Sequence, residues 1–230
     1  MSGAGWCGHR GAGVAPYNLG MPPRRRSRAE SSETRSALLD AAQRLMLEEG
    51  YAAVSSRRVA AEAGVNVALV YYYFETMDEL FLALFRRGAE RSLERQSIAL
   101  SSPQPLWGLW DLTHHGSDPA VTMEFVALAN HRKAIKAEIA DYSRKFRKLQ
   151  LEKLSAALER YGVDPEQWPA SSIILMMAGI SRFLLIEETF ELDTGHAETV
   201  ELIERHITAL EGPRRPGHLE FVSQHASLSF

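Results

Sequence analysis

Six residues in one short stretch carry side chains suited to reading the edges of DNA bases. These residues, all expected to point outward from a helix, are Asn66, Val67, Ala68, Leu69, Tyr71 and Tyr72. An asparagine amide can bond to adenine, and small apolar groups can contact the methyl group of thymine. Tyrosine hydroxyls more often bind phosphate oxygens, which fixes the position of a protein on a duplex. The stretch therefore predicts a helix that reads DNA.

A second short helix precedes it, and a tight turn joins the two. Val59, Ala60 and Ala63 form the apolar face of this first helix. Gly64 stands at the reversal because a residue without a Cβ adopts a positive φ at little cost. Asn66 can cap the second helix through its side-chain oxygen. The arrangement predicts a helix-turn-helix, whose second helix lies in a DNA major groove. For this segment alone, an αα-hairpin inside an ordinary helical bundle is the alternative.

Polar residues around the two helices are candidates for phosphate contacts. Ser55 or Ser56 is expected to cap the first helix, so that the helix amides face a phosphate. Arg57 in its first turn opposes the helix dipole, which makes more sense beside a polyanion. Thr76, three residues before Glu79, forms a capping box that opens the next helix. We include Ser55, Ser56, Arg57 and Thr76 in the predicted DNA face.

Five motifs follow one another without gaps between residues 33 and 82. They are an alanine-rich helix over 33–47, Glu49-Gly50-Tyr51, Ser55-x-Arg57-x-Val59-Ala60-x-x-Ala63-Gly64-Val65, Tyr71-x-Tyr73-Phe74 and Asp78-x-Leu80. This order resembles the DNA-binding domain of the tetracycline-repressor (TetR) family of transcriptional regulators. Three positions depart from the family pattern: Ala68 stands where glycine is frequent, Leu69 where a small hydroxyl residue is common, and Met77 where lysine is usual. Met77 removes one expected phosphate contact.

The resemblance implies an all-α chain in four parts. Residues 1–28 would be a disordered basic extension and 29–77 the three-helix helix-turn-helix domain, followed by a helical ligand-binding and dimerisation domain over 78–211 and a loose tail over 212–230. Apolar spacing and proline positions predict the helices of the larger domain. Their expected ranges are 78–100, 106–116, 119–131, 132–162, 165–189 and 196–210.

Charge is unevenly spread along the chain. The 230 residues carry a formal net charge of −3, which argues against a uniformly basic nucleic-acid-binding surface. Residues 22–95 hold 12 basic against 11 acidic side chains, whereas residues 96–211 hold 11 against 17. The negative charge lies away from the helix-turn-helix, as expected if one end of the molecule meets phosphate.

The remaining composition predicts a cytoplasmic protein. The one cysteine, Cys7, permits no internal disulfide and favours a reducing compartment. No apolar run approaches the roughly 20 residues that a membrane span needs. Residues 1–20 lack the positive start and apolar centre of a signal peptide.

The N-terminal segment holds two features that can be interpreted in more than one way. Met21 begins a basic stretch and is a plausible alternative translation start. Four arginines, Arg24, Arg25, Arg26 and Arg28, form a short arm directly before the first helix. Such an arm could touch the DNA backbone or minor groove, as homeodomain arms do, or it could be a solubilising tail.

In the TetR family, the helical domain that follows the DNA-binding domain holds a small-molecule pocket among its middle helices. Aromatic and methionine side chains suit such an adaptable apolar cavity. The candidates to line it are Trp107, Trp110, His114, Met123, Phe125, Tyr142, Phe146, Met176, Met177 and Phe183. We expect a mainly apolar effector with a few polar anchors such as His114 or Arg182. For any single candidate, an ordinary core residue is the better interpretation.

The helices over 165–189 and 196–210 are the candidate dimer surface. Two such helices from each chain make a four-helix interface in the family that the chain resembles. Two-fold symmetry would place the recognition helices about 34 Å apart, in successive major grooves of a pseudo-palindromic site. The alternative is that both helices only close the core of the monomer.

Neither a metal site nor a catalytic site is expected. Asp111, His114, His115, Asp118 and His131 cluster in sequence, but adjacent histidines on a helix point about 100° apart and do not easily share an ion. No nucleophile elbow, phosphate loop or dinucleotide fingerprint occurs. We therefore expect no cofactor and no enzymatic activity.

The sequence as a whole predicts a homodimeric repressor that is released from double-stranded operator DNA by a small apolar ligand. Two rivals share the fold: an architectural DNA binder without a ligand, and a helical interaction module that no longer binds DNA. A body without a cavity would favour the first rival. Met77 and the modest charge of residues 22–95 favour the second.

Overall fold

The computed structural model describes residues 28–114 and 119–215, and within these ranges the chain forms nine α-helices, one 3-10 helix and no strand. The all-α prediction is confirmed. The helices are α1 (Arg28–Glu49), η1 (Tyr51–Ala53), α2 (Ser56–Glu62), α3 (Val67–Tyr73), α4 (Met77–Leu100), α5 (Pro105–His114), α6 (Pro119–His131), α7 (Lys133–Arg160), α8 (Ala170–Glu188) and α9 (His196–Glu211). Met21, Arg24, Arg25, Arg26, His115 and Asp118 lie outside the described residues.

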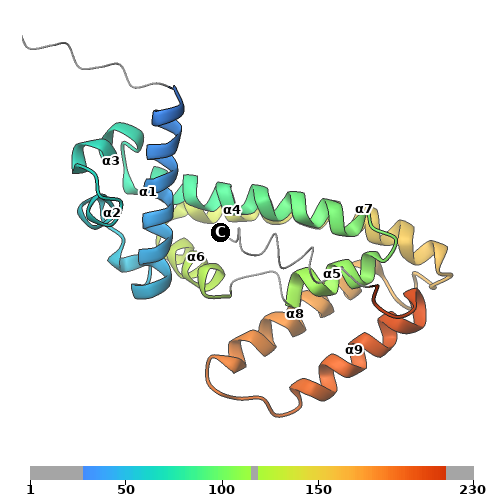
Figure 1. Ribbon diagram of the computed structural model, residues 1–230. Coiled ribbons are helices and arrows are strands. Elements are labelled where there is room, and N and C mark those ends of the chain that lie inside the picture. The colour runs from blue at the N-terminus through green and yellow to red at the C-terminus, as the bar shows by residue number, and fades with distance from the viewer. Residues whose placement is uncertain (1–27, 115–118, 216–230) are drawn as a thin grey trace, which may run out of the picture.

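Helices α1, α2 and α3 form a small head at one end of the molecule (Figure 1). Gly50 ends α1 with a φ of 81°, and Gly64 makes the turn between α2 and α3 with a φ of 66°. The head core consists of apolar side chains that alternate with exposed ones at helical spacing, among them Met46, Val59 and Val70.

The body is built on the two long helices α4 and α7, which lie side by side (Figure 1). Helix α5 is covered on several sides, because α4, α7, α8 and α9 all contact it. Helix α6 lies between the body and the head, where it packs on both α1 and α7. Phe125 of α6 and Phe85 of α4 belong to the same apolar core as the head, so the core continues from the head into the body.

Helix α8 begins at Ala170, five residues after the expected start at 165. Asp164 caps a turn and not the helix, because its carboxylate accepts a hydrogen bond from the backbone N–H of Glu166 at 3.0 Å. Pro169 then disfavours helical geometry at Trp168, because its ring clashes with the preceding backbone. The predicted range 165–189 is therefore too long at its N-terminal end.

Residues 212–215 are not loose, contrary to the expectation for the tail that they begin. The carboxylate of Glu211 accepts hydrogen bonds from the N–H groups of Leu106 at 2.8 Å and Trp107 at 3.0 Å, which satisfies two free amides at the start of α5. The indole of Trp107 donates to the Gly212 carbonyl at 3.0 Å. We call residues 211–215 the C-terminal strap.

The C-terminal strap also places a positively charged side chain, that of Arg214, inside the body. The guanidinium of Arg214 lies 3.1 Å from the carboxylate of Asp111, which is completely buried, and 2.7 Å from that of Glu204. The same guanidinium covers the ring of Trp107 at 4.4 Å. Burial, together with the hydrogen bond to Glu211, raises the pKa of Tyr161 to about 12, so its hydroxyl stays protonated and donates to the strap. The strap could not be predicted from the sequence because its partners on α5 lie about a hundred residues away in the chain.

Gly108 lies where α5 packs tightly against α4. A Cβ at this position would lie 2.7 Å from the carbonyl oxygen of Ala99, a backbone atom that cannot rotate away. We expect Gly108→Ala to lower the free energy of unfolding by about 1–3 kcal/mol, and Gly108→Val to lower it further. Urea denaturation followed by circular dichroism measures both. Equal midpoints for the three proteins would contradict the close approach.

Candidate nucleic-acid interface

Three helix caps hold the helix-turn-helix in place, all at predicted positions. The hydroxyl of Ser55 accepts from the N–H of Arg58 at 3.5 Å, and the side-chain oxygen of Asn66 accepts from the N–H of Ala68 at 2.8 Å. The hydroxyl of Thr76 accepts from the N–H of Glu79 at 3.2 Å. The capping bond occupies one lone pair of the Asn66 oxygen, while its two amide N–H groups face no partner in capping and can donate to a base.

Ser56 is not the cap of α2, and its hydroxyl has a different partner. It lies 2.9 Å from the hydroxyl of Tyr71, so this bond ties the first turn of α2 to α3. Tyr71 therefore has one partner inside the head and still exposes 56% of its surface.

Helix α3 presents one strongly exposed face. Ala68, Tyr71 and Tyr72 lie on this face at spacings of three and four, and 75% of Tyr72 is exposed. Val70 and Phe74 are buried on the opposite side, and Val67 packs partly against the core. Leu69 is half-buried. The exposed surface is therefore narrower than the sequence alone suggested.

Arg57 is the basic residue of α2 that stays available to a phosphate. Its neighbour Arg58 forms a bidentate ion pair with Glu49, whose hydrogen bonds lower the pKa of that carboxyl and raise the pKa of the guanidinium. Arg44 pairs with Glu62 at 2.8 Å. Within the described part of the chain, Arg57 makes no such ion pair and is exposed.

Comparison with known proteins identifies this head. The model of the family described as bacterial regulatory proteins, tetR family, matches residues 38–84. BepR of Brucella suis, an HTH-type transcriptional repressor, is 26% identical over 186 residues, which cover 73% of this chain and 88% of BepR. Residues 38–84 are therefore a DNA-binding domain of the TetR family. The chain is accordingly a DNA-binding transcriptional regulator and not an enzyme.

Further transcriptional regulators resemble a shorter part of the chain or share its fold. CymR of Pseudomonas putida, an HTH-type transcriptional regulator, is 36% identical over 86 residues, which cover 37% of this chain and 42% of CymR. A regulator from Pseudomonas aeruginosa has a TM-score of 0.63 at 20% identity, covering 84% of this chain and 96% of its own. FadR of Bacillus subtilis, solved in complex with stearoyl-CoA, has a TM-score of 0.56 at 14% identity and covers 78% of this chain and 99% of its own.

The ten residues predicted to line a ligand pocket do not share one cavity. Trp107, Trp110 and Phe125 are buried in the core. The ring of His114 stacks on Trp110 with centroids 4.8 Å apart, and burial lowers the pKa of this histidine. Met123, exposed on α6, borders a space of about 80 Å³.

The other five candidates lie in two different places. Met176, Met177 and Phe183 belong to the space between α8 and α9, whereas Tyr142 and Phe146 line a cavity between α4, α5, α6, α7 and α8. Residue type alone indicated apolar surface but not which helix faces meet. The one available signal was a run of polar residues on the inner face of α4, where an ordinary core would be apolar.

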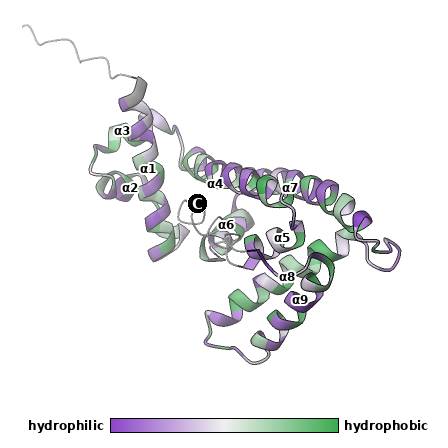
Figure 2. Ribbon diagram, turned by 45° about the vertical axis from the view of Figure 1, so that its right-hand side comes forward, coloured by the Kyte–Doolittle hydropathy of each residue, from purple (hydrophilic) through white to green (hydrophobic). Residues whose placement is uncertain are grey.

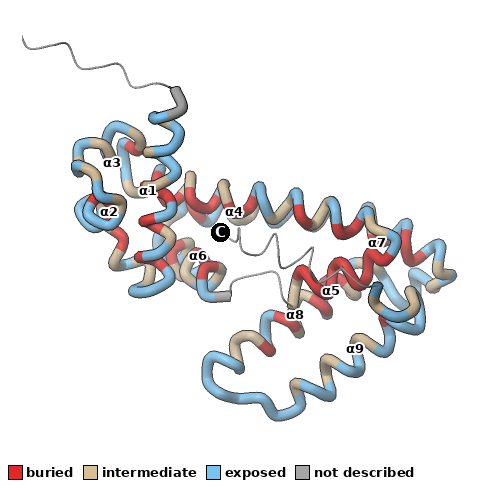
Figure 3. Tube along the Cα trace, in the orientation of Figure 1, coloured by how far each residue is buried: buried red, intermediate tan, exposed pale blue. Residues whose placement is uncertain are grey.

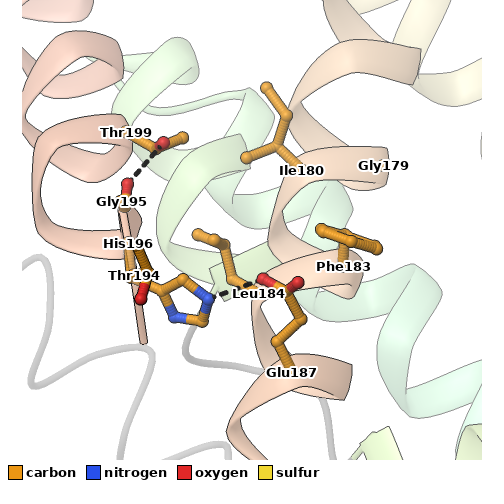
Figure 4. Close-up of a pocket in the computed structure, with 9 residues that line it drawn as sticks. All are labelled: Gly179, Ile180, Phe183, Leu184, Glu187, Thr194, Gly195, His196 and Thr199. Carbon is orange, nitrogen blue, oxygen red and sulfur yellow. Dashed lines mark hydrogen bonds and ion pairs between the residues drawn. The ribbon is translucent and has the colours of Figure 1, made fainter. Parts of the chain in front are cut away.

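The space between α8 and α9 is a long apolar groove. One part, of about 490 Å³, is lined almost entirely by apolar residues, including Ile173, Met176 and Leu202. The other part, of about 520 Å³, lies toward the loop between the helices, where His196 and Glu187 bond at 2.9 Å across it (Figure 4). Hydrophobic residues recur along both helices (Figure 2), and much of this part of the chain is exposed (Figure 3).

Proposed function

We propose that the chain is a homodimeric, cytoplasmic repressor that binds a pseudo-palindromic operator through α2 and α3 and releases it when a small ligand occupies the body. The observation that carries the DNA-binding face is the exposure of Tyr71 and Tyr72 on α3 beside Arg57 on α2. Helix amides, tyrosine hydroxyls and an arginine on one surface suit phosphate, and Ala68 between them suits a base edge.

The groove between α8 and α9 supports dimerisation with a second copy of the chain. Met176, Phe183 and Leu202 expose 44%, 59% and 47% of their surface there. Among the described helices, α8 is the one long and apolar enough to cross a membrane, yet only 22% of its apolar window is buried within the subunit. A partner helix pair would remove this surface from water, which is the main source of association free energy.

Two-fold pairing would fix the geometry of the DNA complex. The head is at the opposite end of α4 from the start of α5, so each subunit would carry its recognition helix away from the body (Figure 1). Two copies of α3 about 34 Å apart would enter successive major grooves of double-stranded DNA.

Helix α6 is the proposed link between the ligand and the head. Thr122 lines the cavity of the body. Two residues later, the carboxylate of Glu124 accepts a hydrogen bond from the backbone N–H of Tyr51 in the head at 2.6 Å. At the end of the same segment, Arg132 forms an ion pair with Asp78 in the first turn of α4. A ligand that displaces α6 would therefore move the head.

The ligand need only bind more tightly to the state in which the two recognition helices are misspaced. The cavities in the body favour a ligand-regulated repressor over an architectural DNA-binding protein that has no ligand. FadR of Bacillus subtilis, which shares the fold, holds stearoyl-CoA in its solved structure.

Two neighbouring arginines test the DNA face. We expect Arg57→Ala to weaken binding to the DNA upstream of the protein's own gene by a similar factor on every sequence, and to reduce the salt slope by about one unit, because one phosphate contact is lost. Arg58→Ala is the matched control, since Arg58 is occupied by Glu49. Fluorescence anisotropy over a salt series measures both.

The outcomes separate the DNA-binding proposal from its rivals. Equal salt slopes for Arg57→Ala and the unchanged protein would contradict the assigned phosphate contact. Failure of the unchanged protein to shift its upstream DNA at low salt would favour the interaction module without DNA binding.

A further inference from the structure

The cavity lined by α4, α5, α6, α7 and α8 has a volume of about 280 Å³, and all the charged residues that line it are basic. Three of its lining residues, Arg95, Arg147 and Arg182, are arginines, and none is an aspartate or glutamate. Arginine stays protonated in proteins. The positive lining therefore favours an anionic guest over a neutral or cationic one.

The lining changes from apolar to polar along α4. Phe85 and Ala89 are followed by Ser92, Arg95 and Gln96, all on the face that borders the cavity. At a rise of about 1.5 Å per residue, Phe85 and Arg95 stand about 15 Å apart along the helix. A guest that matches this gradient has an apolar part near the head and a polar part away from it.

The apolar end is a set of aromatic rings. Tyr142 lies edge-on to Phe85 with centroids 5.7 Å apart, and 6.4 Å from Phe146. The hydroxyl of Tyr142 donates to Glu90 at 3.2 Å, and Glu90 is not among the lining residues. This end thus offers ring surface to hydrocarbon, and its one hydroxyl proton is already donated.

The polar end holds a buried cation and an amide pair. Arg95 exposes 8% of its surface. Burial lowers the pKa of Arg95, and the positive charge of Arg91 lowers it further, so an anion nearby would offset both effects. Gln150 donates to the side-chain oxygen of Gln96 at 2.8 Å, which uses the acceptor of Gln96 and leaves its amide donors for an anion.

We propose that this cavity binds an amphipathic organic anion, with its hydrocarbon on the aromatic rings and its oxyanion beside Arg95 and Arg147. A guanidinium matches the geometry of carboxylate and phosphate alike. The inference refines the mainly apolar effector expected from the sequence. It rests on the proposed function only for the consequence that binding releases DNA.

A series of ligands with one chain and different headgroups tests the proposal on the full-length protein. Calorimetric titration with decanoate, decanol, decylammonium and monodecyl phosphate varies the headgroup alone. We expect either anion to bind about 10-fold or more tightly than decanol, the size of a charge-assisted hydrogen bond. The preference between decanoate and monodecyl phosphate identifies the oxyanion.

Variants tie the preference to the cavity. Arg95→Met and Arg147→Met are expected to bring the anion-to-alcohol ratio close to one while decanol still binds, because the methionine keeps the apolar volume. Lys148→Met is the matched control: it removes a neighbouring exposed charge of α7 that does not line the cavity, and the ratio should persist. Equal binding of decanoate and decanol, tighter binding of decylammonium, or no saturable binding by any ligand would overturn the proposal.

The same ligands in the DNA-binding assay keep the two proposals apart. Anion-selective binding without DNA release would uphold the ligand class and contradict the release mechanism. DNA release by decanol or decylammonium, without preference for the anions, would uphold the release mechanism and contradict the ligand class.

Discussion

Arg214→Ala is expected to lower the free energy of unfolding by about 3–5 kcal/mol, the usual cost of leaving one member of a buried ion pair behind. The carboxylate of Asp111 is completely buried and lies 3.1 Å from the Arg214 guanidinium. Without that cation it loses its charge partner in a region where water does not replace it. Denaturant unfolding followed by circular dichroism measures the loss.

Two further variants separate lost charge pairing from lost packing. Arg215→Ala removes the exposed arginine next in the chain, whose backbone N–H bonds to Gln104 and does not depend on its side chain; it should leave the free energy of unfolding nearly unchanged. The double variant Asp111→Leu with Arg214→Met should recover most of the loss, because an apolar pair can replace a buried ion pair. An effect of Arg214→Ala no larger than that of Arg215→Ala would show that the C-terminal strap is not needed.

A glutamate in the apolar groove is expected to abolish both dimerisation and operator binding. Phe183→Glu and Leu202→Glu each place two charges, one per subunit, in the proposed interface, and burying an unpaired carboxylate costs several kcal/mol. The dimer dissociation constant should therefore rise by about 100-fold or more. Analytical ultracentrifugation measures the association, and anisotropy with operator DNA measures the binding.

Ile98→Glu is the matched control for the groove. Ile98 exposes 46% of its surface, close to the 47% of Leu202, but lies on α4 and not in the groove. This variant should remain dimeric and bind DNA. Unchanged association of Phe183→Glu and Leu202→Glu would exclude the groove as the dimer surface, and monomers that bind operator with full affinity would contradict the two-fold arrangement.

Local chemistry explains which parts of the fold could be predicted from the sequence. The caps at Asn66 and Thr76 and the turn at Gly64 depend on neighbours within a few residues, and the structure has them where they were expected. The alternation that buries Val70 and exposes Tyr72 follows from helical spacing. The caps, the turn and the buried face of the head were therefore predictable from local sequence, whereas Val67 and Leu69, expected to point outward, are half-buried.

Contacts between distant residues explain the rest. The C-terminal strap depends on Asp111, about a hundred residues before Arg214, and no local pattern connects the two. The cavity presents Arg95 inward, whereas the charged residues close to it on α4, Arg91 and Glu94, are exposed. Selecting aromatic and methionine residues as pocket candidates found Tyr142 and Phe146 but not the arginines. Polar side chains are exposed on average, and Arg95, which lines this cavity, departs from that average.

The distance between two copies of the head on DNA tests the central claim most directly. Glu75, exposed directly after α3, can be replaced by cysteine and spin-labelled once Cys7 is changed to serine. Electron–electron double resonance on the operator complex should give one intermolecular distance of about 34 Å, the spacing of successive major grooves. A complex without intermolecular coupling, or with a broad distribution that operator DNA does not narrow, would contradict a dimer that presents two recognition helices to one duplex.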